Sequence, residues 1–171
     1  RYRQALDTLG SGISLKEQYG DRTVAQAYFR LGEVYRRIFT QVPFKLPVER
    51  MTIDMNDKLA LMRQAEEHFL SSVRTRNALW SPRAGFAVAS LYEGFAMDLM
   101  RAEVPAELDE LELQVYTEEL NAKMLPLFRK AQDIHRNNIS MCKTYRFISP
   151  YEEKSKEKVH KIQSTIDRLM P

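Results

Sequence analysis

Apolar residues recur along this chain at steps of three and four positions, which is the period of an amphipathic α-helix. The clearest stretch follows Asp21, a residue that suits an N-cap, and predicts a helix over about 22–41. Its apolar positions are Val24, Ala27, Tyr28, Leu31, Val34, Tyr35 and Ile38. No stretch alternates convincingly with the period of two that marks a β-strand. The pattern therefore predicts an all-α chain.

A second helix is predicted over about 54–74 and a third between Ser81-Pro82, a helix-opening pair, and Val104-Pro105, which ends it. The stripe of the second helix is Met55, Leu59, Met62, Ala65, Phe69 and Val73. The third helix has no charged residue between Ala84 and Tyr92. A helix that is apolar nearly all round is usually packed on several sides, so we place this one at the centre of the fold.

The last third of the chain predicts two more helices, over 107–141 and 149–170. Pro126 should kink or divide the first of them. The sequence Ser149-Pro150-Tyr151-Glu152 is typical of a capping box that opens the second. The apolar seam of this last helix is Val159, Ile162, Ile166 and Leu169. Near the other end of the chain, residues 1–9 predict a short helix before a Gly-Ser-Gly break.

The chain also contains an internal repeat. Residues 27–35 align with residues 84–92 at an offset of 57, and residues 59–65 align with residues 125–131 at an offset of 66. The growing offset is expected if a common helix–loop–helix unit gained a few residues. We predict two units, over 22–74 and 82–142, within one domain spanning 1–171. Residues 149–170 would be a capping helix or the start of a third unit.

Within these units the chain resembles the tetratricopeptide repeat family. The pattern of its first helix is matched by Tyr28, Leu31-Gly32 and Tyr35, and that of its second helix by Ala65, Phe69 and Ser72. The resemblance implies a helical-hairpin solenoid, although the usual repeat of about 34 residues is much shorter than this unit. Long inter-helix loops account for the excess, and a C-terminal capping helix completes the expected fold.

The second unit departs from the family pattern at three places. Gly85 replaces the large residue of the first helix, His135 replaces the aromatic residue of the second, and Asn138 stands where a small residue is expected. Units with such long loops are similar to tetratricopeptide proteins of bacterial envelope and gliding-motility machinery. This likeness favours the bacterial periplasm or cell envelope over the cytoplasm, and a position within a longer chain.

The formal net charge of +3 is distributed unevenly. Residues 79–123 carry three basic and nine acidic side chains, whereas residues from 124 onward carry ten basic and five acidic ones. Because no uniform basic face is indicated, we expect no nucleic-acid binding. No apolar run reaches the roughly 20 residues that span a bilayer, so no transmembrane segment is expected. The start at Arg1, without a signal-like segment, is typical of an excised or processed chain.

Few residues suggest chemistry. His68 and His135 occupy nearly equivalent places in the two units, which makes a bridging metal site conceivable, but repeat equivalence already explains the coincidence. Glu93 and Asp98 lie on the most apolar helix, either as candidate acid–base groups or as structural partners of basic residues. Cys142 is expected to be a small buried side chain. We expect no catalytic residue, cofactor or metal site, and no enzyme.

In the tetratricopeptide family the first helices line a concave groove that binds peptides or partner helices. Carried over to this chain, the resemblance implies a partner-binding groove formed by Gln26, Phe29, Glu33, Arg36, Arg37, Arg83, Phe86, Ser90 and Glu93. Phe29 and Phe86 stand at matching places and are either anchors for a partner or packing residues. Arg36 and Arg37 either engage carboxylates of a ligand or form a solvated edge.

The leading hypothesis is a non-enzymatic scaffold or adaptor that holds other proteins in a larger assembly through this groove. A second hypothesis is a helical ligand-binding or enzymatic domain with a site between the Val42-Pro43 and Val104-Pro105 loops. A third is a self-assembly module, in which the seam of Val159, Ile162, Ile166 and Leu169 contacts a sister copy.

Overall fold

The computed structural model describes residues 22–170, which form five α-helices and no β-strand. The helices are α2 (Arg22–Gln41), α3 (Val48–Arg74), α4 (Ser81–Met100), α5 (Glu110–Thr144) and α6 (Pro150–Leu169). The prediction of an all-α fold is therefore confirmed for these residues. The short helix predicted over 1–9 lies outside the described residues. No helix of residues 22–170 is both long and apolar enough to cross a bilayer.

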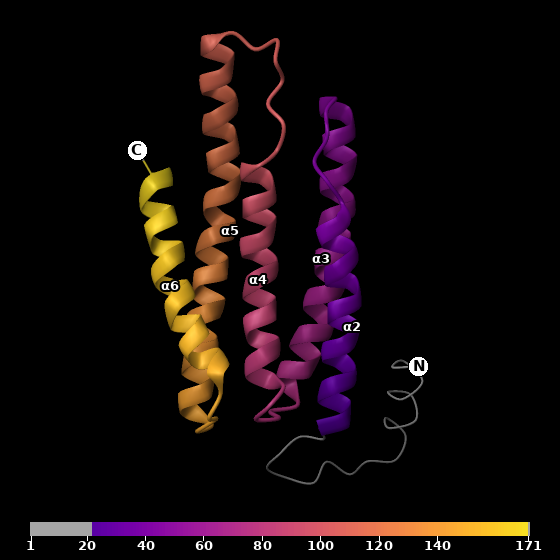
Figure 1. Cartoon of the computed structure of the whole chain (residues 1–171), viewed down its shortest axis with the longest axis vertical. Coiled ribbons are helices and arrows are strands. Elements are labelled where there is room, and N and C mark those ends of the chain that lie inside the picture. Colours follow the sequence, from indigo (N-terminus) through magenta and orange to yellow (C-terminus); the bar gives the residue numbers. More distant parts are fainter. Residues whose placement is uncertain (1–21, 171) are drawn as a thin grey trace.

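Consecutive helices run antiparallel and lie side by side, with α4 between α3 and α5 (Figure 1). Helix α3 packs most extensively on α2, and α5 packs most extensively on α4. Helix α6 covers α5 and also touches α4. Because α4 contacts all four other helices, it occupies the centre that its apolar sequence predicts.

Two helices, α3 and α5, begin several residues away from their predicted starts. Helix α3 begins at Val48, six residues before the predicted start, because Pro47 directly precedes the first turn rather than extending the loop. Helix α5 begins one residue after Asp109, whose side chain accepts from the Glu112 amide at 2.9 Å in a capping box. It then continues through Pro126 without being divided.

The buried stripe of α2 differs from the predicted one. Val34 and Ile38, predicted to face the core, are 50% and 44% exposed. The buried residues are instead Ala25, Ala27, Phe29, Gly32 and Phe39. This face brings two phenylalanines into the core and places Gly32 against α3, where an added Cβ would lie only 2.5 Å from Cδ1 of Phe69. Ring burial and close helix contact therefore decide which face turns inward.

The hairpins α2–α3 and α4–α5 carry equivalent hydrogen bonds. Ser72 Oγ donates to the backbone oxygen of Ala25 at 2.8 Å, and Asn138 Nδ2 donates to that of Pro82 at 3.1 Å. Each pair joins the second helix of a hairpin to the start of its first helix. The donors are 66 positions apart and the acceptors 57, which are the two offsets found by aligning the chain with itself.

Ring contacts recur in the same way. The ring centroids of Phe29 and Phe69 are 5.3 Å apart in the first hairpin, and those of Phe86 and His135 are 5.1 Å apart in the second. Such a pair of rings contributes roughly 0.5–1.5 kcal/mol beyond the area it buries. The ring contact therefore lies at the same place in both hairpins, although different residues form it.

A single lysine ties the first hairpin to α4. Lys58 is 1% exposed, and its Nζ donates to the backbone oxygens of Phe39 and Val42 at 2.8 and 2.6 Å. The same nitrogen pairs with Asp98 Oδ2 at 2.9 Å. All three donor positions of the ammonium are therefore used. Lys58 satisfies carbonyls at the end of α2 and fixes that end against α4.

Candidate functional site

One side of α4 lies partly open between α2 and α6, and we call its half-buried residues Arg83, Phe86, Ser90 and Glu93 the α4 face. The period of the helix brings these residues to one side. They are the four residues of α4 that the sequence predicts for a partner-binding groove. Contacts to α2 occur at its Arg83 end, and contacts to α6 occur at Phe86 and Glu93.

Two arginines and two aromatic rings meet at the Arg83 end of the α4 face. The Arg83 guanidinium carbon lies 4.8 Å from the ring centroid of Phe29 and 5.3 Å from that of Trp80. The guanidinium carbon of Arg30 lies 5.9 Å from the same Trp80 ring. Arg83 also stands in the first turn of α4, where the helix dipole disfavours a positive charge. These contacts gather two positive charges on one aromatic platform.

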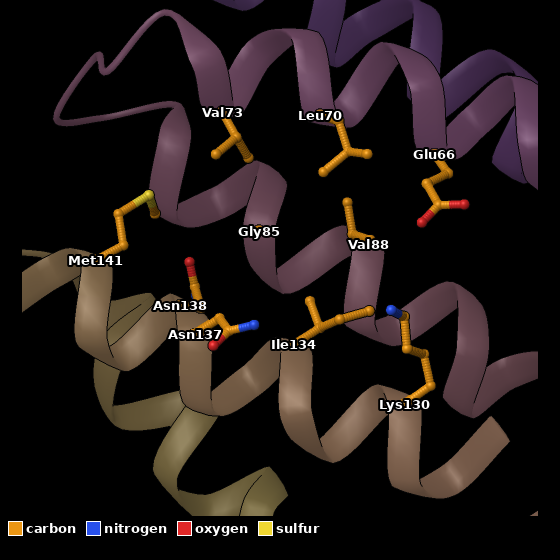
Figure 2. A pocket seen from close by; sticks show the side chains of 10 residues that line it. All are labelled: Glu66, Leu70, Val73, Gly85, Val88, Lys130, Ile134, Asn137, Asn138 and Met141. Carbon is orange, nitrogen blue, oxygen red and sulfur yellow. The ribbon is translucent and has the colours of Figure 1, made fainter. Parts of the chain in front are cut away.

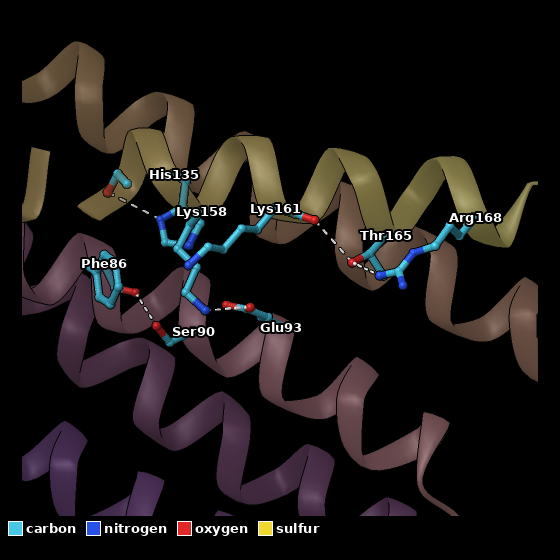
Figure 3. A network of polar contacts seen from close by, with 9 residues as sticks. Phe86, Ser90, Glu93, His135, Lys158, Lys161, Thr165 and Arg168 are labelled. Carbon is cyan, nitrogen blue, oxygen red and sulfur yellow. Dashed lines mark hydrogen bonds and ion pairs between the residues drawn. The ribbon is translucent and has the colours of Figure 1, made fainter. Parts of the chain in front are cut away.

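The opposite end of the α4 face is joined to α6, as Figure 3 shows. Lys158 Nζ pairs with Glu93 Oε1 at 2.7 Å, and the ring of Phe86 lies 5.5 Å from that of Tyr151. Ser90 donates its hydroxyl proton to the backbone oxygen of Phe86 at 2.9 Å. Phe86 is therefore held between α5 and α6, with an exposed edge, rather than standing free as an anchor.

The prediction that Phe29 anchors a partner is wrong. Its side chain is only 3% exposed, since the rings of Phe69 and Trp80 pack on it at 5.3 and 5.2 Å. Phe29 is instead a packing residue, which is the alternative interpretation of its sequence position. Trp80, the one tryptophan of the chain, precedes the helix-opening Ser81-Pro82 pair and was the missing element of the predicted site.

The predicted groove residues of α2 do not form a single cluster. Glu33 and Arg36 pair with each other through two hydrogen bonds of 2.8 and 2.9 Å, which raise the pKa of Arg36. Arg37 is exposed, as the solvated-edge interpretation expects, and Gln26 is half-buried. Arg30, which the sequence did not single out, is the residue of α2 that approaches the α4 face.

The seam predicted for self-association is used inside the chain. Ile162 and Ile166 are 2% and 4% exposed and belong to the main hydrophobic core, on which Leu169 also packs. Val159 is half-buried, and its backbone oxygen accepts from Gln132 Nε2 at 3.2 Å. The prediction that this seam contacts a sister copy is therefore wrong, because α5 already covers it.

A buried polar cluster joins α4, α5 and α6. Ser155 Oγ lies 3.3 Å from His135 Nδ1 and accepts from Asn138 Nδ2 at 3.0 Å. Burial, with a smaller contribution from the charge of Lys158, lowers the pKa of His135 to about 4. A serine beside a histidine is the arrangement of an activated nucleophile. Here both side chains are fully buried, so a substrate cannot reach them and the pair links helices.

The other residues considered for chemistry have structural partners. Asp98 pairs with Lys58, and Glu93 with Lys158. His68 stacks on the Tyr35 ring at 5.4 Å. Within residues 22–170, no group of three or more His, Cys, Asp and Glu side chains could hold a metal ion.

Cys142 is 1% exposed, as predicted, and burial raises its pKa to about 11. The thiol is therefore a packing group rather than a reactive thiolate.

The loops considered for a second kind of site meet at one end of the molecule. The amide of Leu46 donates to Glu103 Oε2 at 3.3 Å, which connects the α2–α3 loop to the α4–α5 loop. Tyr116 of α5 donates to the backbone oxygen of Glu103 at 3.3 Å. These contacts brace the two loops but bring together no acid–base pair.

Comparison with known proteins gives no information about these surfaces. No family model matches the chain. No curated protein and no solved structure matches it either.

Proposed function

We propose that this chain is a non-enzymatic helical scaffold, arranged as a tetratricopeptide-like solenoid piece, that binds another protein across the α4 face. Two observations support the solenoid arrangement. The hairpins repeat their hydrogen bonds and ring contacts at matching places, and the first helices α2, α4 and α6 are neighbours in sequence order. Preformed helices would let a partner bind without a large ordering cost in the scaffold.

The observation that carries the proposal is the pair formed by Arg30 and Arg83. Neither arginine forms an ion pair with another side chain of residues 22–170, although each is held over the Trp80 ring. The acidic residues Glu33 and Glu93 on the same two helices are already paired with Arg36 and Lys158. Two fixed and uncompensated guanidinium groups favour a carboxylate of the partner. The proposed partner is therefore an acidic protein segment.

Trp80 provides the readout for the test, since it is the only tryptophan in the chain and lies under both arginines. We expect a glutamate-rich peptide to change its fluorescence saturably, with affinity that falls as salt is added. A lysine-rich peptide of equal length should have no effect.

The matched variants are Arg30→Gln and Arg83→Gln, with Arg37→Gln as the control, because Arg37 is exposed on the same helix as Arg30. Each of the first two should weaken binding by roughly 1–3 kcal/mol, as expected for a charge-assisted hydrogen bond. Equal affinity of the Arg30→Gln, Arg83→Gln double variant and the wild type would refute the α4 face as the binding surface.

A further inference from the structure

A cavity of about 390 Å³ lies between α3, α4 and α5, on the side of α4 that carries Gly85 and Val88 (Figure 2). The positions of these residues on the helix place the cavity away from the α4 face. Its middle is apolar, with Leu70 from α3, Val88 from α4 and Ile134 from α5. This volume falls in the range of sites that hold small molecules.

Gly85 and Asn138 line one part of the cavity. The repeat alignment places Gly85 where the first hairpin has the large side chain of Tyr28. An added Cβ at Gly85 would meet the side-chain oxygen of Asn138, which stands where the first hairpin has the smaller Ser72. The Asn138 side chain therefore fills the space beside Gly85, and the two residues together form part of the cavity wall.

Opposite charges flank one end of the cavity. Glu66 extends from α3 and Lys130 from α5, on facing walls in Figure 2. The two form no ion pair with each other. Tyr92 donates its phenolic proton to Glu66 Oε1 at 2.9 Å and holds that carboxylate in place. The fold therefore presents a carboxylate held by Tyr92 and an exposed ammonium group beside an apolar hollow.

We propose that this cavity binds a free α-amino acid with an apolar side chain. The ligand's ammonium group would contact the Glu66 carboxylate, and its carboxylate would contact the Lys130 ammonium. Its side chain would occupy the hollow between Leu70, Val88 and Ile134. A zwitterion matches both charges, whereas a simple amine or a simple acid leaves one of them without a partner. The proposal does not depend on the function proposed for the α4 face.

Three matched probes test the charge requirement: L-leucine, isopentylamine, which lacks the carboxylate, and isocaproate, which lacks the amine. Binding would be followed by chemical shifts of isotope-labelled methyl groups of Leu70, Val88 and Ile134. L-Leucine should bind saturably. Each single-charge probe should bind about threefold to fivefold more weakly, the factor expected for one solvent-exposed ion pair.

Charge-neutral variants then assign each end of the ligand. Glu66→Gln should weaken L-leucine and isopentylamine but leave isocaproate unchanged, whereas Lys130→Gln should weaken L-leucine and isocaproate but leave isopentylamine unchanged. The control is Glu67→Gln, an exposed neighbour of Glu66 that does not line the cavity. It should bind all three probes as the wild type does.

Filling the hollow provides a test that does not involve charge. Leu70→Trp should abolish L-leucine shifts while helix content, measured by circular dichroism, stays unchanged. Absence of saturable L-leucine binding to the wild-type protein would overturn the proposal, as would equal affinity for the three probes. Peptide binding at Trp80 reports on the α4 face separately, so either proposal can fail without the other.

Discussion

At the residue scale, His135 occupies an environment that favours its neutral form. The ring lies against Phe86, and its Nδ1 faces the hydroxyl of Ser155. Lys158 is the charged group near enough to lower its pKa further. In the first hairpin the equivalent position is Phe69, a residue with no charge to lose. The second hairpin therefore has a titratable imidazole at the position where the first hairpin has a phenyl ring.

This environment predicts a loss of stability in mild acid. The unfolded imidazole takes up a proton near its ordinary pKa of 6.5, whereas the folded one does so only near pH 4. Stability is therefore retained above pH 6.5 and falls as the pH drops from 6.5 to 4, by up to about 1.4 kcal/mol per pH unit. Urea unfolding across this range would measure the slope.

The matched variant for this prediction is His135→Phe, which restores the residue found at the equivalent place in the first hairpin. This variant should remove the part of the pH dependence of stability that comes from His135. The contributions of other titratable groups should remain. The same slope in the variant and the wild type would show that His135 does not set the response.

At the element scale, two helical glycines have opposite surroundings. An added Cβ at Gly32 would meet Phe69 at 2.5 Å, whereas one at Gly94 would have its nearest neighbour, Phe39, at 3.9 Å. We expect Gly32→Ala to destabilise the protein by roughly 1–3 kcal/mol, since the Phe69 ring must move. Gly94→Ala should stabilise it by up to about 1 kcal/mol through helix propensity.

Thermal unfolding of the two alanine variants compares the same chemical change in two helices. Gly32→Ala should lower the midpoint, and Gly94→Ala should raise it or leave it unchanged. If both variants were stabilised, the contact between α2 and α3 would have to be looser than the Gly32–Phe69 approach implies.

The apolar period predicts the existence, order and approximate ends of the five helices, because each has a long stripe and a cap or proline at its boundary. It does not predict which stripe of α2 turns inward. The sequence offers Val34 and Ile38 on one side and Phe29 and Phe39 on the other, and packing against α3 decides between them. Amphipathicity marks a helix more reliably than it marks the buried face when both sides carry large apolar residues.

The candidate sites were less predictable than the helices. Arg83, Phe86 and Glu93 follow from the family resemblance and do share one side of α4. Arg30 lies on α2 and Trp80 lies in the α3–α4 turn, so they come together only in the folded chain. No local sequence pattern relates them. No local pattern predicts the cavity, because its lining residues come from three helices. Its charged walls come from helices far apart in sequence.

At the scale of the whole molecule, Lys58 connects three helices through one nitrogen atom. We expect Lys58→Met to destabilise the fold by about 2–4 kcal/mol, because two carbonyl oxygens and the Asp98 carboxylate lose their donor. Urea unfolding would measure this loss. Lys123→Met is the control, since Lys123 is exposed on α5 and should change stability by less than about 0.5 kcal/mol.

A small effect of Lys58→Met would mean that the end of α2 is held mainly by its apolar contacts. The rings of Phe39 and Phe44 would then be the stronger attachment to α4, since both pack near Phe95, at 6.2 and 6.0 Å.

Helix α5 extends well beyond its packed portion: no residue of 110–123 is buried, and burial begins at Met124. Backbone hydrogen bonds in the first part therefore have little tertiary support, and only local opening is needed to expose them. Amide hydrogen exchange should divide this continuous helix into two kinetic regions. Amides of 111–122 should exchange within the dead time of a manual experiment, whereas those of 128–142 should exchange only when the whole protein unfolds.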